Sequence, residues 1–204
     1  ADLVKAVYWA NTQGFDAVII GCFYDLCLHE CREVAGNMIV IAPCQASLQV
    51  ASNISNRTSI IIGQNKWRHK IESNVRHYGQ RHLVGSLVSC HKSVSNYLGD
   101  KESSQQALIV ASQHAIQHDY AESIILGCSA NLGMYKALQS TLGIPVIDPA
   151  LAALSLAQCM AKTKTLGWGT SHNTSLEAPW QQEPEATKYF STARDSIGER
   201  LTVK

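Results

Sequence analysis

Two cysteines of this 204-residue chain occupy equivalent places in one repeated local pattern. The segment Asp16–Cys22 reads as an acid, a small residue, three aliphatic residues, a glycine and a cysteine, and Glu122–Cys128 repeats it 106 residues later. Each cysteine directly follows an expected strand and shortly precedes an expected helix, whose positive end lowers the pKa of a nearby thiol. Two such thiols on opposite sides of one substrate suit a two-base racemase. One thiolate removes a proton from a carbon acid, and the opposite thiol delivers a proton to the other face.

The repeat extends beyond the two cysteines. Ile39–Pro43 falls on Pro145–Pro149 in the same ungapped register, so that each proline stands 21 residues after its cysteine. A shared register of this kind indicates duplication of one α/β unit. Two copies of a lobe usually pack about a pseudo-two-fold axis, and ligands of α/β proteins bind outside the carboxyl ends of the strands. We therefore expect Cys22 and Cys128 to face each other across a cleft between two lobes.

The elements that must position these cysteines alternate between short aliphatic runs and helical patterns. Strands are expected at Asp16–Gly21, Ile39–Ala42, Ser59–Gly63, His82–Val88, Ser123–Gly127 and Pro145–Asp148. Helices are expected at Asp2–Gln13, Asp25–Val34, Gln45–Ile54, Lys66–Tyr78, Ser104–His118, Leu132–Leu142 and Leu151–Lys162. The runs are apolar on both faces, as in covered parallel sheets. The alternation predicts an α/β fold with right-handed crossovers.

The repeat also divides the chain into lobes. We expect a first lobe of residues 1–56 and 150–204, including a polar tail with a last helix near Ala186–Leu201, and a second lobe of residues 57–149. The first lobe has two expected strands and the second has four. Subtracting the repeat length places the missing strands before Ala1. We therefore expect about 50 or more further N-terminal residues in the gene product, and little or no activity from the 204-residue form.

Composition excludes several classes of protein. Hydrophobic residues make up 46% of the chain and charged residues 16%, which is enough apolar material for a sizeable core. Seventeen basic and sixteen acidic residues give a net charge of +1, so a nucleic-acid partner is not expected. No apolar run reaches the length of a membrane span, and a membrane partner is not expected either. Seven cysteines, an odd number without secretory features, favour a reducing, cytoplasmic setting.

Two clusters contain residue types that can bind metals, but both are expected to be structural. Cys22, Cys27, His29 and Cys31 have a spacing that could bind zinc. On a helix, however, Cys27 and Cys31 share a face from which His29 points away, so core cysteines without metal are expected. His114 and His118 stand four residues apart on one expected helix without a third ligand, and are expected at the surface.

Three motifs resemble those of a known superfamily. Gly21-Cys-Phe-Tyr-Asp25 resembles a Cys-Phe-Gly-Asp segment, Leu126-Gly-Cys-Ser129 resembles a Leu-Gly-Cys-Ala segment, and Gly143–Asp148 resembles the strand that follows it. Together they resemble the aspartate/glutamate/hydantoin racemase superfamily, and within it the hydantoin and allantoin racemases. The resemblance extends from Asp2 to about Pro179.

The resemblance implies two pseudo-symmetric, tandem flavodoxin-like lobes with parallel sheets, and a homo-oligomer that needs no cofactor and no metal. It makes Cys22 and Cys128 the catalytic residues of a racemase acting on a small five-membered cyclic ureide, hydantoin or allantoin. Backbone N–H groups after each cysteine would receive the developing enolate oxygen. The substrate-binding residues are then Phe23, Tyr24, Ser129 and Ala130.

Departures from the family pattern leave the substrate open. Tyr24 replaces a glycine, and Ser129-Ala130-Asn131 replaces Ala-Gly-Met. Three alternatives therefore stand beside the racemase: a related carbon-acid isomerase or decarboxylase of the same superfamily, a catalytically inactive truncated binding module, and a zinc-binding regulator.

Overall fold

The computed structural model describes residues 2–169, and its contacts group the chain into two compact units. Of the described residues, the smaller unit comprises 2–19, 27–41 and 157–169. The larger unit comprises Ile20–Leu26 and Ala42–Leu156. The expected last helix and the polar tail lie outside the described residues.

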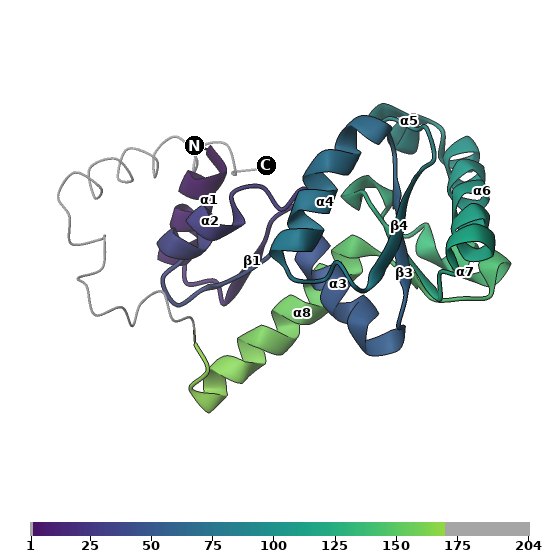
Figure 1. The fold of residues 1–204 in the computed structure, drawn as a ribbon. Helices are drawn as coiled ribbons and strands as arrows, with labels where there is room; N and C mark the ends of the chain where they lie inside the picture. The colour runs from purple at the N-terminus through teal and green to yellow at the C-terminus, as the bar shows by residue number, and fades with distance from the viewer. Residues whose placement is uncertain (1, 170–204) are drawn as a thin grey trace. The chain divides into compact units, whose positions relative to one another are not determined.

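A four-stranded parallel sheet forms the centre of the larger unit, with the strand order β4-β3-β5-β6 (Figure 1). The strands are β3 (Thr58–Ile62), β4 (Val84–Ser89), β5 (Ser123–Leu126) and β6 (Val146–Ile147). The helices are α3 (Pro43–Ile54), α4 (Arg68–His77), α5 (Val94–Gly99), α6 (Lys101–Asp119), α7 (Tyr135–Leu142) and α8 (Pro149–Thr163), of which α8 continues into the smaller unit. Single 3-10 turns stand at Asn65–Trp67, Ser129–Asn131 and Lys164–Leu166.

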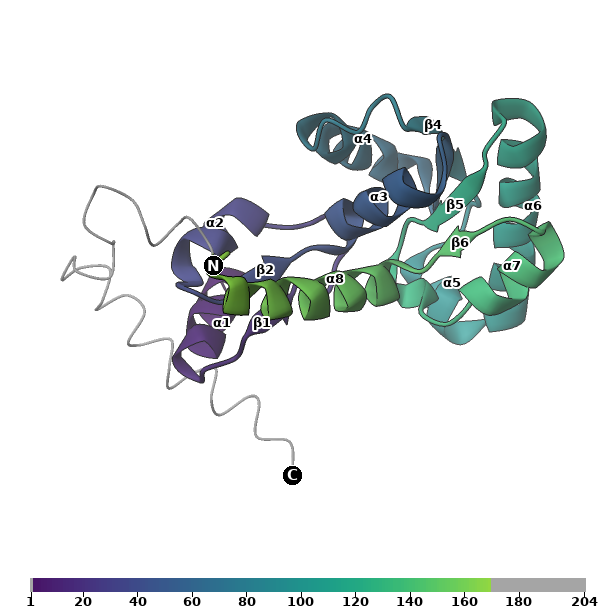
Figure 2. The same cartoon turned by 90° about the horizontal axis from the view of Figure 1, so that it is seen from below.

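Helices cover both faces of this sheet because its strands are apolar on both sides. Helices α3 and α4 pack together on one face, while α6 and α7 pack together on the other (Figure 1). Seen from below, β5 and β6 lie side by side between α3 and α7 (Figure 2). Ile61, Ile124 and Leu126 join the core under α6. All residues of β3 and β5 are buried, so the sheet is the main hydrophobic core.

The smaller unit contains a two-stranded parallel sheet of β1 (Ala17–Ile19) and β2 (Ile39–Ile41), with α1 (Asp2–Thr12) packed on α2 (Leu28–Val34). Its register reproduces that of the larger sheet. Val18 pairs with Val40 as Ile124 pairs with Val146, 106 residues later in both strands. The structure therefore confirms the α/β class and the internal repeat.

The division into units differs from the expected lobes. Residues 20–26, 42–56 and 150–156 group with the larger unit, although the repeat predicts them in the first lobe. Their placement follows from the packing of α3, which contacts α4 and the strands β5 and β6. Ala46, Leu48 and Ala51 of α3 are fully buried there. The apolar face of α3 thus belongs to the core of the larger sheet. The sequence does not show which sheet a helix covers, because it does not give the order of the strands.

One helix was not expected. Helix α5 has six residues, too few to show an apolar period, but Ser93 and Asn96 form a capping box at its start. The Asn96 N–H donates to the Ser93 hydroxyl, and the Ser93 N–H donates to the Asn96 side chain. Buried Tyr97 anchors α5 on the core.

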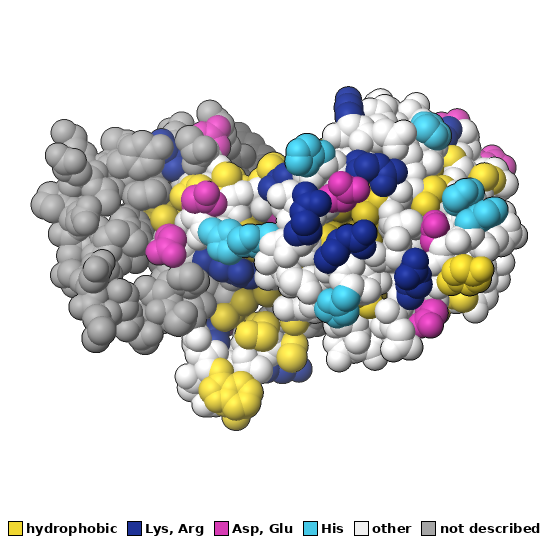
Figure 3. All heavy atoms as spheres, in the orientation of Figure 1, with side chains coloured by type: hydrophobic (Ala, Val, Ile, Leu, Met, Phe, Trp, Pro, Cys, Tyr) yellow, Lys and Arg dark blue, Asp and Glu magenta, His cyan; other side chains and the backbone are white. Residues whose placement is uncertain are grey.

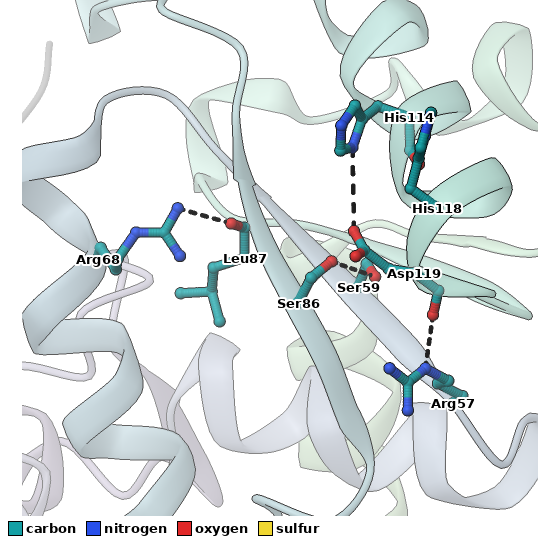
Figure 4. Close-up of polar contacts among 8 residues, drawn as sticks. All are labelled: Arg57, Ser59, Arg68, Ser86, Leu87, His114, His118 and Asp119. Atoms are coloured by element: carbon teal, nitrogen blue, oxygen red, sulfur yellow. Dashed lines mark hydrogen bonds and ion pairs between the residues drawn. The ribbon is translucent and has the colours of Figure 1, made fainter.

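Strand β4 is the edge of the larger sheet, and side chains cover part of it. The Arg68 guanidinium donates a 2.7 Å hydrogen bond to the carbonyl oxygen of Leu87, and Ser86 bonds Ser59 of the neighbouring strand at 2.8 Å (Figure 4). Arg81 donates to the carbonyl oxygen of Val84 at 2.8 Å. The two arginine bonds satisfy backbone acceptors that an edge strand would otherwise present to solvent. No helix among residues 2–169 is long and apolar enough to cross a membrane.

Candidate active site

A mostly apolar pocket of about 490 Å³ lies at the carboxyl ends of the strands in the larger unit. All six residues expected to act on substrate line it. Trp67 and Val94 line it too, and sequence analysis missed both. The lining residues are Gly21, Cys22, Phe23, Tyr24, Trp67, Val94, Gly127, Cys128, Ser129 and Ala130. Every one of them belongs to the larger unit, whereas we expected a cleft between lobes.

A tight turn carries the first thiol. The Asp25 N–H donates to the Cys22 carbonyl oxygen at 3.0 Å, so the chain reverses within four residues. The Asn74 side chain of α4 donates to the carbonyl oxygen of Tyr24 at 2.8 Å. The half-buried Cys22 thiol and the Tyr24 ring are therefore held at the pocket by the larger unit itself.

A similar turn carries the second thiol. Gly127 continues β5 by donating to the carbonyl oxygen of Ile61 at 2.8 Å, and a Cβ there would meet that oxygen at 2.7 Å. The Asn131 N–H then donates to the Cys128 carbonyl oxygen at 3.1 Å. The Ser129 hydroxyl donates to the carbonyl oxygen of Gly21 at 2.9 Å, which links the two thiol turns directly.

The pKa of Cys128 reflects both its burial and its charged neighbours. Burial raises the pKa of Cys128, and the charges of Cys22 and Cys90 raise it further, while the N–H of Ala130 bonds the sulfur and lowers it. Partial burial likewise raises the pKa of Tyr24, with smaller contributions from both Cys22 and Cys128. The Tyr24 hydroxyl therefore lies within electrostatic reach of both thiols.

The expected lowering of the Cys128 pKa by a helix is wrong, and the geometry explains it. A single 3-10 turn, Ser129–Asn131, follows Cys128, and α7 begins only at Tyr135. One short turn carries too few aligned peptides to outweigh the burial of the thiol. The N–H of Ala130 hydrogen-bonds the Cys128 sulfur and partly offsets the effect of burial on the pKa of this thiol.

Trp67 forms an aromatic wall of the pocket because Gly63 leaves room for it. A Cβ at Gly63 would lie 2.5 Å from the Trp67 ring and would press on the carbonyl oxygen of Lys92. No short motif marks this pair in the sequence. Trp67 ends a 3-10 turn that follows β3, and only the tertiary structure brings it beside Val94 and the thiols.

The other cysteines lie apart from the lining of the pocket. All seven cysteines are free. Burial raises the pKa of Cys31 to about 11 and that of Cys44 well above its ordinary value. Cys27 is exposed, contrary to its expected core position, and has left-handed backbone geometry just before α2. Cys159, on α8, is exposed too. Residues 2–169 contain no group of three or more His, Cys, Asp or Glu side chains that could hold a metal ion.

His114 and His118 are surface residues, as expected. Their rings stack with centroids 4.4 Å apart. The Nδ1 atom of His118 lies 3.1 Å from the carbonyl oxygen of His114, and the His114 ring lies 4.0 Å from the carboxylate of Asp119 (Figure 4). These contacts are local to α6 and involve neither thiol.

A second hollow, of about 380 Å³, lies beside α4 and the edge strand β4 and has a charged lining. Figure 3 shows Lys and Arg side chains gathered there with acidic and histidine side chains among them. Arg68 and Arg81 each donate to a carbonyl oxygen of β4, and Arg68 lies 3.8 Å from Glu72. Two of its arginines thus cover the edge strand, and the hydroxyl of Ser86, which also lines the hollow, is hydrogen-bonded to Ser59.

The fold and the two thiols that line one pocket define a class of α/β protein with paired cysteines, and comparison with known proteins identifies the family. The sequence profile of the Asp/Glu/hydantoin racemase family matches residues 1–157, and the chain belongs to this family. The family predicted from the motifs is thereby confirmed.

Individual relatives agree with this assignment. A hydantoin racemase of Rhizobium meliloti is 36% identical over 158 residues, which are 78% of this chain and 65% of that protein. A hydantoin racemase of Paenarthrobacter aurescens is 30% identical over 168 residues, covering 82% of this chain and 70% of that protein. The chain thus spans about two thirds of the length of these relatives.

Solved structures show the same fold. An allantoin racemase from Klebsiella pneumoniae superposes with a TM-score of 0.77 at 22% identity, over 88% of this chain and 75% of that chain. An allantoin racemase from Pseudomonas fluorescens superposes with a TM-score of 0.73 at 23% identity, over 80% and 70% of the two chains.

Proposed function

We propose that this protein racemises a hydantoin-type cyclic ureide through Cys22 and Cys128, without a cofactor. One observation carries the proposal: both thiols line one pocket that also has apolar walls suited to an organic ring. The effect of the Cys22 charge on the pKa of Cys128 supports it. Membership of the Asp/Glu/hydantoin racemase family supports the class of reaction.

The proposed reaction is a proton transfer through the ring plane. The thiolate of one cysteine takes the proton from the ring carbon that bears the substituent, and the electron pair moves onto the adjacent carbonyl oxygen. The opposite thiol then gives its proton to the other face of the same carbon, and the electron pair returns. The enantiomer is inverted, and the two sulfurs have exchanged protonation states.

Backbone groups near the thiols would stabilise the enolate. We assign this role to the N–H groups of Phe23, Tyr24 and Ser129, which lie on the turns that line the pocket. The N–H of Ala130 has a different role, because it bonds the Cys128 sulfur and favours the thiolate needed in one direction of the reaction.

The walls of the pocket favour a substrate with an apolar substituent. Phe23, Tyr24, Trp67 and Val94 give it aromatic and aliphatic surface. A hydantoin with a benzyl or alkyl side chain can bury that group against them, whereas the ureido group of allantoin would lose hydrogen bonds to water on entering such a site. We therefore place substituted hydantoins before allantoin.

The test is deuterium exchange combined with optical rotation. Single enantiomers of benzylhydantoin and methylhydantoin, and of allantoin, are incubated with the protein in D2O. We expect the protein to exchange and invert benzylhydantoin fastest. Exchange without inversion would indicate another isomerase, and CO2 release from a malonate-type acid would indicate a decarboxylase. A complete lack of exchange would overturn the proposal.

A further inference from the structure

The two thiol turns are matched at the level of single hydrogen bonds. Asp25 donates its N–H to the Cys22 carbonyl oxygen, and Asn131, 106 residues later, donates its N–H to that of Cys128. The side chains at these matched positions differ. The Asp25 carboxylate is 5% exposed, whereas the Asn131 amide is fully buried beside the hydroxyl of Tyr97.

Each repeat nevertheless has a buried carboxylate that accepts N–H groups from the first turn of a helix. In both repeats this is the helix that follows the second strand. In the first repeat, Asp25 accepts the N–H groups of Cys44 and Gln45 at the start of α3, both at 2.9 Å. In the second, Asp148 accepts those of Ala150 and Leu151 at the start of α8, at 3.0 and 3.4 Å. The N–H groups are equivalent, because Ala150 and Leu151 follow Cys44 and Gln45 by 106 residues.

The two carboxylates come from crossed positions in the repeat. Asp25 stands in the thiol turn and reaches out to the helix. Asp148 stands at the end of β6, at the position that Ala42 holds in the first repeat. Its side chain bonds the thiol loop, the segment between Cys128 and the start of α7. Its Oδ2 atom accepts the N–H of Gly133 at 2.7 Å. The same connection between thiol loop and helix is therefore made twice, from opposite ends.

Such buried carboxylates are costly unless their oxygens are bonded, and both are. Asp25 has a third donor in the Tyr78 hydroxyl at 2.9 Å. Asp148 is 4% exposed and uses both oxygens. Neither carboxylate lines the pocket, so neither is placed to exchange a proton with substrate. Their bonds instead fix the loops on which Cys22 and Cys128 stand.

We infer that Asp25 and Asp148 are positioning residues, each of which holds one of the two thiols at the distance and angle that proton transfer requires. The inference rests on the proposed function. A displacement of about 1 Å at a reacting group can lower a rate by about 100-fold. Because each carboxylate serves one thiol, removing it should impair proton transfer at one face of the substrate more than at the other.

The test compares Asp25→Asn and Asp148→Asn with the wild type in D2O, starting from each pure enantiomer of benzylhydantoin. Asparagine keeps the size of the side chain but loses one acceptor oxygen. We expect Asp25→Asn to slow exchange of one enantiomer by about 10-fold or more relative to the other, and Asp148→Asn to shift this ratio in the opposite direction. Equal slowing of both enantiomers by both variants would overturn the inference.

A matched control separates positioning from loss of stability. Ser47→Ala removes a buried 2.7 Å hydrogen bond to the carbonyl oxygen of Pro43 in the same first turn of α3, without touching a thiol loop. It should lower the melting temperature as the aspartate variants do, but leave the ratio of the two exchange rates unchanged. Thermal unfolding of each variant confirms that it is folded at the assay temperature. The ratio of exchange rates for each aspartate variant is compared with that of the wild type separately.

A second measurement distinguishes failure of this inference from failure of the proposed function. If the wild type exchanges neither enantiomer, the proposed function is wrong, and iodoacetamide labelling then tests the positioning alone. Asp25→Asn should change the labelling rate of Cys22 by about threefold or more and leave Cys128 unchanged, with the reverse for Asp148→Asn. Equal changes at both thiols would contradict the inference.

Discussion

The Ser129 hydroxyl donates a 2.9 Å hydrogen bond to the carbonyl oxygen of Gly21, so the residue after one thiol is bonded to the residue before the other. The two residues are 108 positions apart in the chain. Both belong to the larger unit, which therefore contains both thiols and the pocket they line. The packing of the larger unit alone therefore positions both thiols.

Replacing either thiol should abolish racemisation. A serine hydroxyl is far too weak an acid to share the proton, so Cys22→Ser and Cys128→Ser should each lower the rate by about 1000-fold or more. Each variant should still exchange deuterium into one enantiomer, the one whose proton faces the remaining thiol. Polarimetry and mass spectrometry in D2O measure the two effects separately. A variant that racemises near the wild-type rate would show that the two-base assignment is wrong.

Alkylation should reveal the raised pKa of Cys128. Because burial raises its pKa above the ordinary value of 9.0, less thiolate is present at neutral pH than at a free cysteine. Iodoacetamide at pH 7.5 should modify Cys128 more slowly than the exposed Cys27 and Cys159. The Cys128 rate should keep rising with pH beyond 9, as peptide mass mapping can follow. Faster modification of Cys128 than of Cys27 at pH 7.5 would contradict this.

The buried Asp25 should make stability depend on pH. Burial raises the pKa of Asp25 from 3.8 to about 6, against the opposing effects of its hydrogen bonds from Cys44, Gln45 and Tyr78 and of the charge on Lys70. The folded chain therefore binds this proton more tightly than the unfolded chain does. The stabilisation is fully present below about pH 4 and is lost as the pH rises to about 6.

The corresponding measurement is urea unfolding of the wild type and of Asp25→Asn between pH 4 and 7. The wild type should lose up to about 3 kcal/mol relative to the variant across this range, the free-energy equivalent of the shift in pKa. Asparagine does not titrate, so the variant should show a flatter profile. Parallel profiles for the two proteins would show that Asp25 does not titrate in this range.

Gly63 should be intolerant of even one added methyl group. A Cβ at this position would lie 2.5 Å from the Trp67 ring, so Gly63→Ala should displace the indole from the pocket and destabilise the fold by about 1–3 kcal/mol. The KM for benzylhydantoin should rise more than that for methylhydantoin, because the larger substituent uses the aromatic wall.

A matched glycine provides the control. A Cβ at Gly99, at the end of α5, meets no atom within 4 Å, so Gly99→Ala should change stability by less than about 0.5 kcal/mol and leave both KM values unchanged. If Gly63→Ala behaves like Gly99→Ala in both assays, Trp67 does not depend on Gly63 for its place in the pocket.

Local sequence determined much of this protein. Aliphatic runs predicted the six strands found among residues 2–169, since such runs are stable only when covered on both faces. The two thiols could be found because the repeat keeps Cys22 and Cys128 in one register, which the strand pairing of Val18 with Val40 and of Ile124 with Val146 reproduces. The resemblance of the motifs around the thiols gave the family.

Only the tertiary structure decided which surfaces surround the thiols. The repeat predicts helix α3 in the first lobe, yet its apolar face packs on β5 and β6. The Cys22 turn is joined to α3 because Asp25 accepts the N–H groups of Cys44 and Gln45. Trp67 reaches the pocket because Gly63 leaves space. The pKa of Cys128 depends on its burial more than on the turn that follows it. Each of these outcomes depends on groups far apart in the chain, so a local pattern of residue types does not carry it.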